Sequence, residues 1–186
     1  FELSGVALDG AKSERFKEIK EQLSVLSNQF SKNVLQSTNS WKKTVSANDL
    51  KGYGADEFSK VKKGDHYEIS LQVPVYIDLM TYADSSDLRE EVYKAYISRA
   101  SDIGITSKEF NNRPIMDEIL KLRSEMSELV GFSNYAEYST QSKMVESPDA
   151  VVEFLNSLIE QSTPQAKAEL SDLERFAGHA LMPWDL

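Results

Sequence analysis

Apolar residues recur at helical spacing along most of the chain. The first such stretch covers residues 9–41 and predicts a long helix whose start Asp9 can cap. Its apolar positions are three or four residues apart, which places them on one stripe: Phe16, Ile19, Leu23, Leu26 and Phe30. Helical patterns return from Ser86 onward and continue almost to the end of the chain. The chain is therefore predicted to be mainly helical.

Cap residues and breakers divide the second half into separate helices. Asn112 and Pro114 open one helix, which Gly131 closes because glycine tolerates a positive φ. Ser133 can cap a shorter helix that reaches Met144. A further start at residues 147–149 combines a cap hydroxyl, a first-turn proline and an acid at the positive end of the helix dipole. Pro164 is expected to break or kink this last helix.

One segment has the period of a strand instead. Tyr67, Ile69, Leu71 and Val73 alternate with polar residues, and Pro74 ends the alternation and can open a short helix. Residues 42–65 are polar and contain three glycines, so we expect a loop there with room for a short helix. The predicted fold class is all-α, a helical lobe of mostly antiparallel helices with one short β element near residues 67–73.

Composition narrows the classes of partner. Thirty acidic residues against 21 basic give a formal charge of −9, which repels phosphate backbones and anionic lipid. No apolar run approaches the roughly 18 residues of a membrane span, and no cysteine is present. We therefore expect neither a nucleic-acid nor a membrane partner, and the composition fits a reducing compartment.

Candidate chemistry is sparse. His66 and His179 are the only histidines, and neither has a second histidine at the spacing of a zinc-binding helix. No nucleophile elbow and no complete dinucleotide fingerprint occur. Four tyrosines in the second half are open to two interpretations, as core residues with a wet hydroxyl or as the wall of a channel that binds a peptide: Tyr93, Tyr96, Tyr135 and Tyr138.

Five segments along the chain carry specific combinations of residues. The most specific is the run 131–138 followed by Lys143-Met144 and Ser147-Pro148. The others are residues 1–5, residues 88–96 with 99–101, residues 112–115 with 118–123, and residues 183–185. Taken in order, the five segments resemble the thimet oligopeptidase family of zinc metallopeptidases. The resemblance covers nearly the whole chain and is weakest over residues 42–66.

The resemblance implies an almost wholly helical cytoplasmic enzyme that cleaves short peptides in a narrow channel. It implies a zinc ion on an H-E-x-x-H helix with a further glutamate downstream, but this chain ends before those ligands. Residues 1–186 are therefore expected to be a single helical segment of a larger peptidase, with no catalytic and no metal residue of its own. Its partners would be the remaining catalytic portion of the same polypeptide and short peptide substrates.

On this interpretation the segment helps to wall the substrate channel, and Tyr135, Tyr138 and Lys143 are the candidate contacts. Surfaces meant for the rest of the enzyme would then be exposed, around Trp184 and on the last helix, so the chain is expected to self-associate or to be partly disordered. The alternative hypothesis is a self-contained helical adaptor or scaffold that binds partner helices, supported by the stripe on the first helix as a coiled-coil seam.

Overall fold

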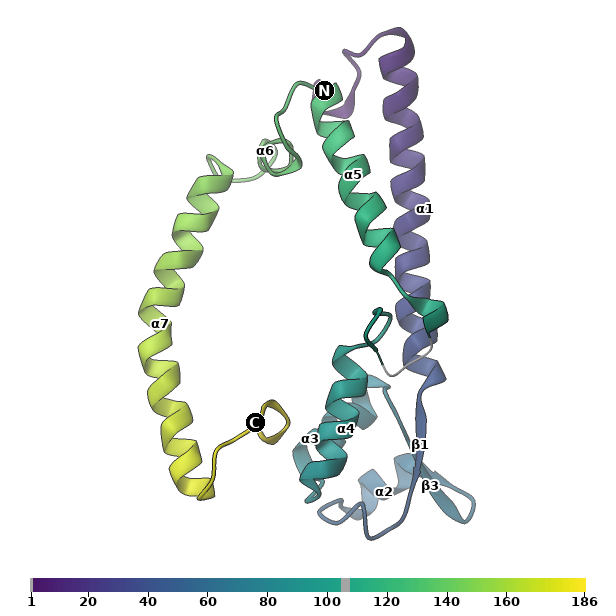
Figure 1. The fold of residues 1–186 in the computed structure, drawn as a ribbon, viewed down its shortest axis with the longest axis vertical. Coiled ribbons are helices and arrows are strands. Elements are labelled where there is room, and N and C mark those ends of the chain that lie inside the picture. Colours follow the sequence, from purple (N-terminus) through teal and green to yellow (C-terminus); the bar gives the residue numbers. More distant parts are fainter. Residues whose placement is uncertain (1, 105–107) are drawn as a thin grey trace. The chain divides into compact units, whose positions relative to one another are not determined.

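The computed structural model describes residues 2–104 and 108–186 (Figure 1), so Phe1 of the opening motif lies outside the described residues. The chain divides into two compact units of 93 residues each. The first unit contains Phe1–Ser27 and Ile115–Ala180, and the second contains Asn28–Pro114 and Leu181–Leu186. Helix α1 (Gly10–Ser40) contributes residues to both.

The first unit contains only helices among its described residues. After the short 3-10 turn η1 (Glu2–Ser4), the start of α1 packs against α5 (Arg113–Leu129), which is followed by α6 (Tyr135–Thr140) and α7 (Pro148–Ala177). Its buried cluster consists of Phe16, Ile19, Leu122 and Met126. The predicted apolar stripe of α1 is therefore confirmed. Its first residues, Phe16 and Ile19, pack against α5 within the same unit.

An ion pair joins the same two helices. The Arg15 guanidinium donates to both oxygens of Glu125, from Nε at 2.6 Å and from Nη2 at 2.8 Å. The two parallel hydrogen bonds hold the guanidinium and the carboxylate in one relative orientation, in addition to the attraction between their charges. The hydrogen bonds from Arg15 lower the pKa of the Glu125 carboxyl group. The pair ties residues 110 positions apart in the sequence and thus fixes the alignment of α1 on α5.

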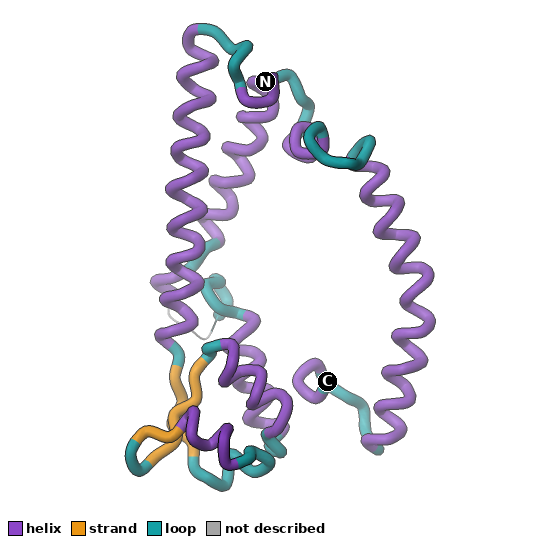
Figure 2. The backbone as a smooth tube through the Cα atoms, turned by 180° about the vertical axis from the view of Figure 1, so that it is seen from behind, coloured by secondary structure: helices purple, strands orange, loops and turns teal. Residues whose placement is uncertain are grey.

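The second unit contains a three-stranded antiparallel sheet in the order β1-β3-β2 (Figure 2). Its strands are β1 (Lys42–Val45), β2 (Lys62–Lys63) and β3 (His66–Ser70), and Lys43 lies opposite Ile69 in the register. The helices of this unit are α2 (Ala55–Val61), α3 (Val73–Tyr82) and α4 (Ser86–Ile97), with the 3-10 turns η2 (Lys108–Phe110) and η3 (Pro183–Asp185). Its buried cluster includes Leu50, Ile69, Leu71, Leu79 and Val92, which are all fully shielded from solvent.

The β element predicted near residues 67–73 is present and ends earlier, at Ser70. The stretch 42–65 contains α2 and also β1 and β2, which the sequence did not reveal. Each of these strands has at most four residues, too few to show a period of two. They are strands because they pair with β3, and strand preference depends strongly on such context. Pro74 lies in the first turn of α3, as predicted.

A buried polar junction connects the second part of α1 to the segment before α5. Asn112 is 2% exposed, and its side chain accepts a hydrogen bond from Asn33 at 2.8 Å and donates to the Phe30 carbonyl at 3.1 Å. Its backbone N–H donates to the carbonyl of Ala100 at 2.8 Å, and the Ala100 N–H donates to the Ser37 hydroxyl at 3.0 Å. Ala100 has a φ of +52°, a conformation that costs energy for a residue with a Cβ atom and that these bonds hold in place.

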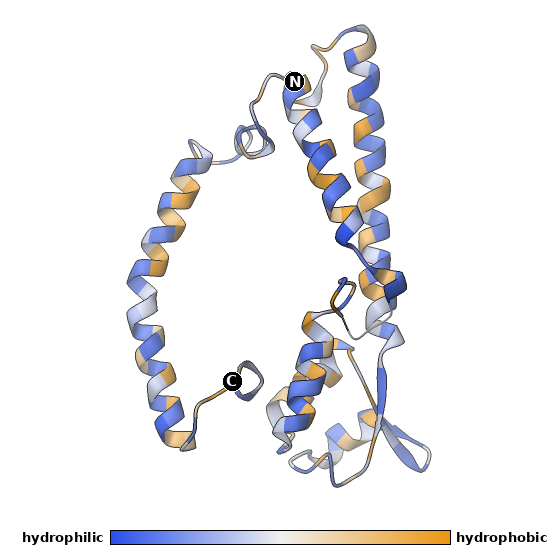
Figure 3. Ribbon diagram, in the orientation of Figure 1, coloured by the Kyte–Doolittle hydropathy of each residue, from blue (hydrophilic) through white to orange (hydrophobic). Residues whose placement is uncertain are grey.

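Helix α7 runs without interruption through Pro164, so the first of the two outcomes expected there, a break rather than a kink, is absent. A proline removes one backbone hydrogen bond, and the residues around Pro164 are exposed, so water can satisfy the freed carbonyl. Ser147 caps the helix as predicted, accepting from the Ala150 N–H at 3.1 Å. None of the 30 residues of α7 is buried. Figure 3 shows apolar residues along the length of α7. Among the apolar residues of this helix, Phe154, Leu158 and Phe176 are 63%, 47% and 92% exposed.

Helix α6 is shorter than predicted. It is capped by Asn134 rather than Ser133, and it ends at Thr140 rather than at Met144. The Asn134 side chain accepts from the Glu137 N–H at 2.9 Å, and the Glu137 carboxylate accepts from the Ser133 N–H at 3.3 Å. This reciprocal arrangement satisfies two amides at the helix start, which places the boundary one residue later.

Trp184 is less exposed than the sequence led us to expect. It is half-buried beside α4, where its carbonyl accepts from Arg89 Nε at 2.8 Å and its ring lies 6.0 Å from that of Tyr93. Arg89 also donates to Asp185 at 2.6 Å, and this pair is shielded to 15% and 9% side-chain exposure. The last residues of the chain are therefore anchored to α4. The apolar residues of the last helix, α7, are exposed as expected.

Candidate functional site

Tyr135 and Tyr138 lie on the first turn of α6, and Lys143 follows shortly after the helix ends. Residues three apart share one face of a helix, so the two rings are neighbours, with centroids 5.8 Å apart. The cap at Asn134 fixes where this turn begins and hence which way both rings face.

Each tyrosine is half-buried and has its own partners. The Tyr138 hydroxyl donates to the carbonyl of Leu3 at 2.8 Å, and its ring meets Phe132 edge-on at 5.7 Å. Burial is the main cause that raises the pKa of the Tyr138 hydroxyl. The Tyr135 ring lies beneath the guanidinium of Arg123, 4.8 Å from its centroid. Both rings pack against the core of the first unit while keeping one side open.

All three candidate residues line one hollow, which we call the tyrosine hollow. It has a volume of about 390 Å³. Its lining consists of Leu3, Ser4, Lys20, Tyr135, Tyr138, Ser139, Ser142 and Lys143. A second hollow of about 370 Å³ shares Lys20 and both tyrosines and continues along α1 and α5 to Ser27 and Arg123. The structure thus brings together residues that lie more than 100 positions apart in the sequence.

Positive charge gathers at this place in an acidic protein. Lys20 and Lys143 line the tyrosine hollow, and Arg123 lines the adjoining one. Ammonium and guanidinium groups beside aromatic hydroxyls can bind carbonyl and carboxylate oxygens. Lys20 and Arg123 were not singled out by the sequence, because nothing local distinguishes them from other charged residues on the flank of an apolar stripe.

The other two tyrosines lie in the second unit. Tyr96 stacks on Tyr76 with ring centroids 3.8 Å apart, and the Arg99 guanidinium lies 3.5 Å from the Tyr96 ring centroid. Tyr93 lies beside Trp184. The four tyrosines that the sequence grouped together are therefore two pairs, one in each unit, and each pair has its own aromatic and cationic neighbours.

The two histidines are exposed and lie in different units. His66 is the first residue of β3, and His179 follows α7, where its Nδ1 lies 2.9 Å from the Ala180 carbonyl oxygen. Over residues 2–104 and 108–186, no three His, Cys, Asp or Glu side chains come together as a metal site would require. The described residues thus do not fit a zinc ion. Within the same residues, no helix has both the length and the apolar character needed to cross a membrane.

Residues 79–186 match the profile of Peptidase family M3, which is more than half of the chain. The chain belongs to this family. Oligopeptidase A of Salmonella typhimurium is 41% identical over 198 residues that cover 100% of the chain, and oligopeptidase A of Escherichia coli is equally similar. Among plant relatives, the probable cytosolic oligopeptidase A of Arabidopsis thaliana is 37% identical over 99% of the chain.

These M3 relatives are much longer proteins. The chain spans 29% of the length of each bacterial oligopeptidase A and 28% of the Arabidopsis protein. The matched region of the family profile includes α4, α5, α6 and the tyrosine hollow residues on and after α6. The family resemblance recognised from the sequence motifs is confirmed.

Proposed function

We propose that the chain is a non-catalytic helical portion of a cytoplasmic zinc metalloendopeptidase that hydrolyses short peptides. The observation that carries this proposal is the similarity at 41% identity across the whole chain to proteins named oligopeptidase A. The name of the Arabidopsis relative, a probable cytosolic oligopeptidase A, supports the compartment.

The catalytic ion belongs elsewhere on this proposal. Because the described residues do not converge on a metal site, the zinc ligands would lie in the remaining catalytic portion of the same polypeptide. The chain alone would then neither hold catalytic zinc nor cleave peptides. A direct test is to sequence the reading frame beyond the codon for Leu186. An H-E-x-x-H helix with a downstream glutamate is expected there, and a stop codon close by would contradict the proposal.

The contribution of this segment would be to help wall the substrate channel. The tyrosine hollow supports that role, since it offers a flat aromatic surface, hydroxyl groups and two ammonium groups in one concave place. An extended peptide presents backbone carbonyls and a terminal carboxylate, which such groups bind. Tyr135, Tyr138 and Lys143 would hold the peptide in place and take no part in breaking its bond.

A chimera tests the channel role. The matching segment of Escherichia coli oligopeptidase A is replaced by this chain, and hydrolysis of a quenched fluorescent peptide is measured with zinc bound. Lys143→Gln and Tyr135→Phe are expected to raise KM by about threefold to tenfold and to leave kcat nearly unchanged, because uniform binding is lost. Lys17→Gln and Tyr82→Phe, which lie outside the hollow, serve as matched controls. An unchanged KM in a folded, active chimera would rule out contact with substrate.

A further inference from the structure

A concave surface separate from the two hollows lies on the first unit, and we propose that it binds short peptides carrying both cationic and apolar side chains. This acidic groove is lined by Glu18, Glu21, Gln22, Val25, Leu26, Glu118 and Leu122 and has a volume of about 450 Å³. The proposal is independent of the peptidase assignment, since it concerns binding to this chain alone.

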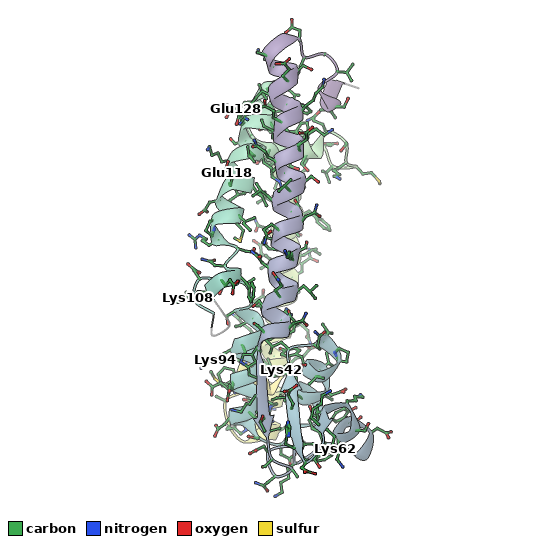
Figure 4. All side chains as sticks on the ribbon, turned by 90° about the vertical axis from the view of Figure 1, so that its right-hand side faces the viewer. Lys42, Lys62, Lys94, Lys108, Glu118 and Glu128 are labelled. Carbon is green, nitrogen blue, oxygen red and sulfur yellow. The ribbon has the colours of Figure 1, made fainter. Side chains whose placement is uncertain are left out.

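Two helices build the groove. Its α1 residues follow the spacing 18, 21, 22, 25 and 26, which is one face of a helix, and Glu118 and Leu122 are one turn apart on α5. Figure 4 shows Glu118 on α5 with α1 beside it. Leu122 belongs to the buried core and forms the floor, whereas Val25 is 67% exposed. The groove therefore offers an apolar base that a bound side chain would shield from water.

The rim of the groove is negative, and no cation lines it. Glu18 accepts from Arg15 at 3.1 Å and Glu118 lies 3.6 Å from Lys121, and both are exposed pairs between neighbours on one helix. Such pairs are weak and exchange readily with other cations. Glu21 forms no ion pair within the part of the chain that the structure describes. Three carboxylates are thus available to an incoming positive charge.

The surrounding field strengthens this preference. The first unit has 17 acidic against nine basic residues, a formal charge of −8, while the whole chain has −9. A concave site of one sign concentrates ligands of the opposite sign. A lysine or arginine side chain also suits the groove in shape, because its aliphatic stem can lie on Val25 while its charged end reaches the rim.

The groove and the tyrosine hollow select for opposite charges. Lys20, Leu23, Ser24 and Ser27 face the hollows, and they are offset by two residues from four of the five groove positions on α1, which are 18, 21, 22 and 25. Two residues correspond to about 200° around a helix, so the surfaces lie on nearly opposite sides of α1. A ligand held by its carboxylate and a ligand held by its cations would therefore bind independently.

The test uses the chain with three fluorescently labelled hexapeptides, each acetylated and amidated so that no terminal charge reaches the tyrosine hollow. The sequences are Lys-Leu-Leu-Arg-Leu-Lys, its acidic counterpart Glu-Leu-Leu-Glu-Leu-Glu, and the hydrophilic Lys-Gly-Ser-Arg-Gly-Lys. Fluorescence anisotropy gives each Kd. We expect the first peptide to bind at least about tenfold more tightly than either of the others, and to weaken as salt screens the carboxylates.

Variants then locate the binding site. Glu21→Gln combined with Glu118→Gln is expected to weaken binding of the first peptide by about threefold to tenfold, and Val25→Ser by a similar factor. Glu14→Gln combined with Glu128→Gln (Figure 4) removes two charges from α1 and α5 outside the groove, so it is the matched control and should change Kd by less than about twofold. All variants are checked for unchanged helicity by circular dichroism.

Three results would overturn the proposal. The first is equal affinity for the cationic and the acidic peptide, which would make the groove a merely apolar surface. The second is an equal loss of affinity in the control and in the groove variant, which would reduce the effect to net charge. The third is self-association of the chain through Val25, which would assign the groove to a second copy. The Lys143→Gln substitution in the chimera tests the peptidase proposal separately, so the two proposals can fail independently.

Discussion

The two units have the same number of residues but bury them differently. Among the described residues, the second unit has an eleven-residue buried cluster supplied by strands, loops and helices, and the first has a four-residue cluster between α1 and α5. The second unit also anchors the end of the chain through a shielded ion pair, whereas α7 in the first unit buries no residue. Equal length thus does not give equal burial.

The net charge is also distributed unequally between the two units. The first unit has a formal charge of −8 and the second has −1. The unit with the smaller core therefore has both most of the exposed large hydrophobic residues and nearly all the net charge. Extended apolar surface next to strong charge is typical of a region that binds something else. The second unit has the features of a self-sufficient fold, and both candidate binding surfaces lie on the first.

The largest expected effect is a core truncation in the second unit. Leu79 is 0% exposed, so Leu79→Ala should lower the free energy of unfolding by about 2–5 kcal/mol. Both tryptophans, Trp41 and Trp184, belong to this unit, so their fluorescence during urea unfolding reports it selectively. Leu155→Ala on α7, where the side chain is 50% exposed, is the control and should leave this transition unmoved. Equal losses would break the contrast between the units.

Removal of the anchor at the chain end should have a smaller effect. Asp185→Asn loses the bond from Arg89 and is expected to cost about 1–3 kcal/mol, because a shielded guanidinium is left underpaired. The hydrogen bond from Arg89 lowers the pKa of the Asp185 carboxyl group. Its stabilisation is therefore present above the unfolded value of about 3.9 and is lost as the pH falls through the lowered folded pKa.

Urea unfolding of both proteins between about pH 7 and pH 2, followed by the fluorescence of Trp41 and Trp184, measures this anchor. The difference between wild type and Asp185→Asn should vanish at the acid end. Glu91→Gln in the same unit removes a carboxylate whose pair with Lys43 is much more exposed than the Asp185 pair, and it should change stability by about 0.5 kcal/mol or less. A pH-independent difference for Asp185→Asn would contradict the role of its charge.

The cap of α7 tests how far this helix depends on local interactions. Ser147→Ala removes the bond to the Ala150 N–H and should destabilise the helix by about 1 kcal/mol. Hydrogen exchange at the amides of the first turn should then accelerate. Ser157→Ala in the middle of the same helix is the matched control, and exchange should stay the same or slow because alanine favours helix. No change for Ser147→Ala would mean that other contacts hold α7.

The smallest effect on stability is expected from the apolar face of α7. Phe154→Glu combined with Leu158→Glu should change the free energy of unfolding by about 0.5 kcal/mol or less, because both side chains are already exposed. The same change should lower the self-association that we expect of the wild-type chain, as measured by sedimentation velocity over a range of concentrations. Ser157→Glu adds charge without removing apolar surface and is the control. A wild-type chain that stays monomeric throughout would refute this prediction.

The sequence predicted the long helices well because each has many turns of regular apolar spacing and a recognisable cap. Helix α1 and the start of α7 at Ser147-Pro148 are confirmed for this reason. It failed for β1 and β2, which are too short to carry a pattern, and for a break at Pro164, which lies within a continuous helix. It also placed the start of α6 one residue early, because two adjacent residues can both act as caps.

For the candidate site, the sequence supplied Tyr135, Tyr138 and Lys143 but could not supply their neighbours. Lys20 and Arg123 complete the surroundings of the two tyrosines only because α1 and α5 pack side by side. The acidic groove was invisible for the same reason, since Glu21 and Glu118 lie about 100 residues apart and each looks like an ordinary solvated charge.

By itself the sequence determined the helical class, the main caps, the acidic balance and the membership of a peptidase family. These features depend on local spacing, on composition and on motifs read in order. Only the tertiary structure decided which surfaces exist: the junction around Asn112, the anchor between Arg89 and Asp185, the tyrosine hollow and the acidic groove. Such contacts join residues distant in the sequence, and their alignment depends on packing that no local pattern encodes.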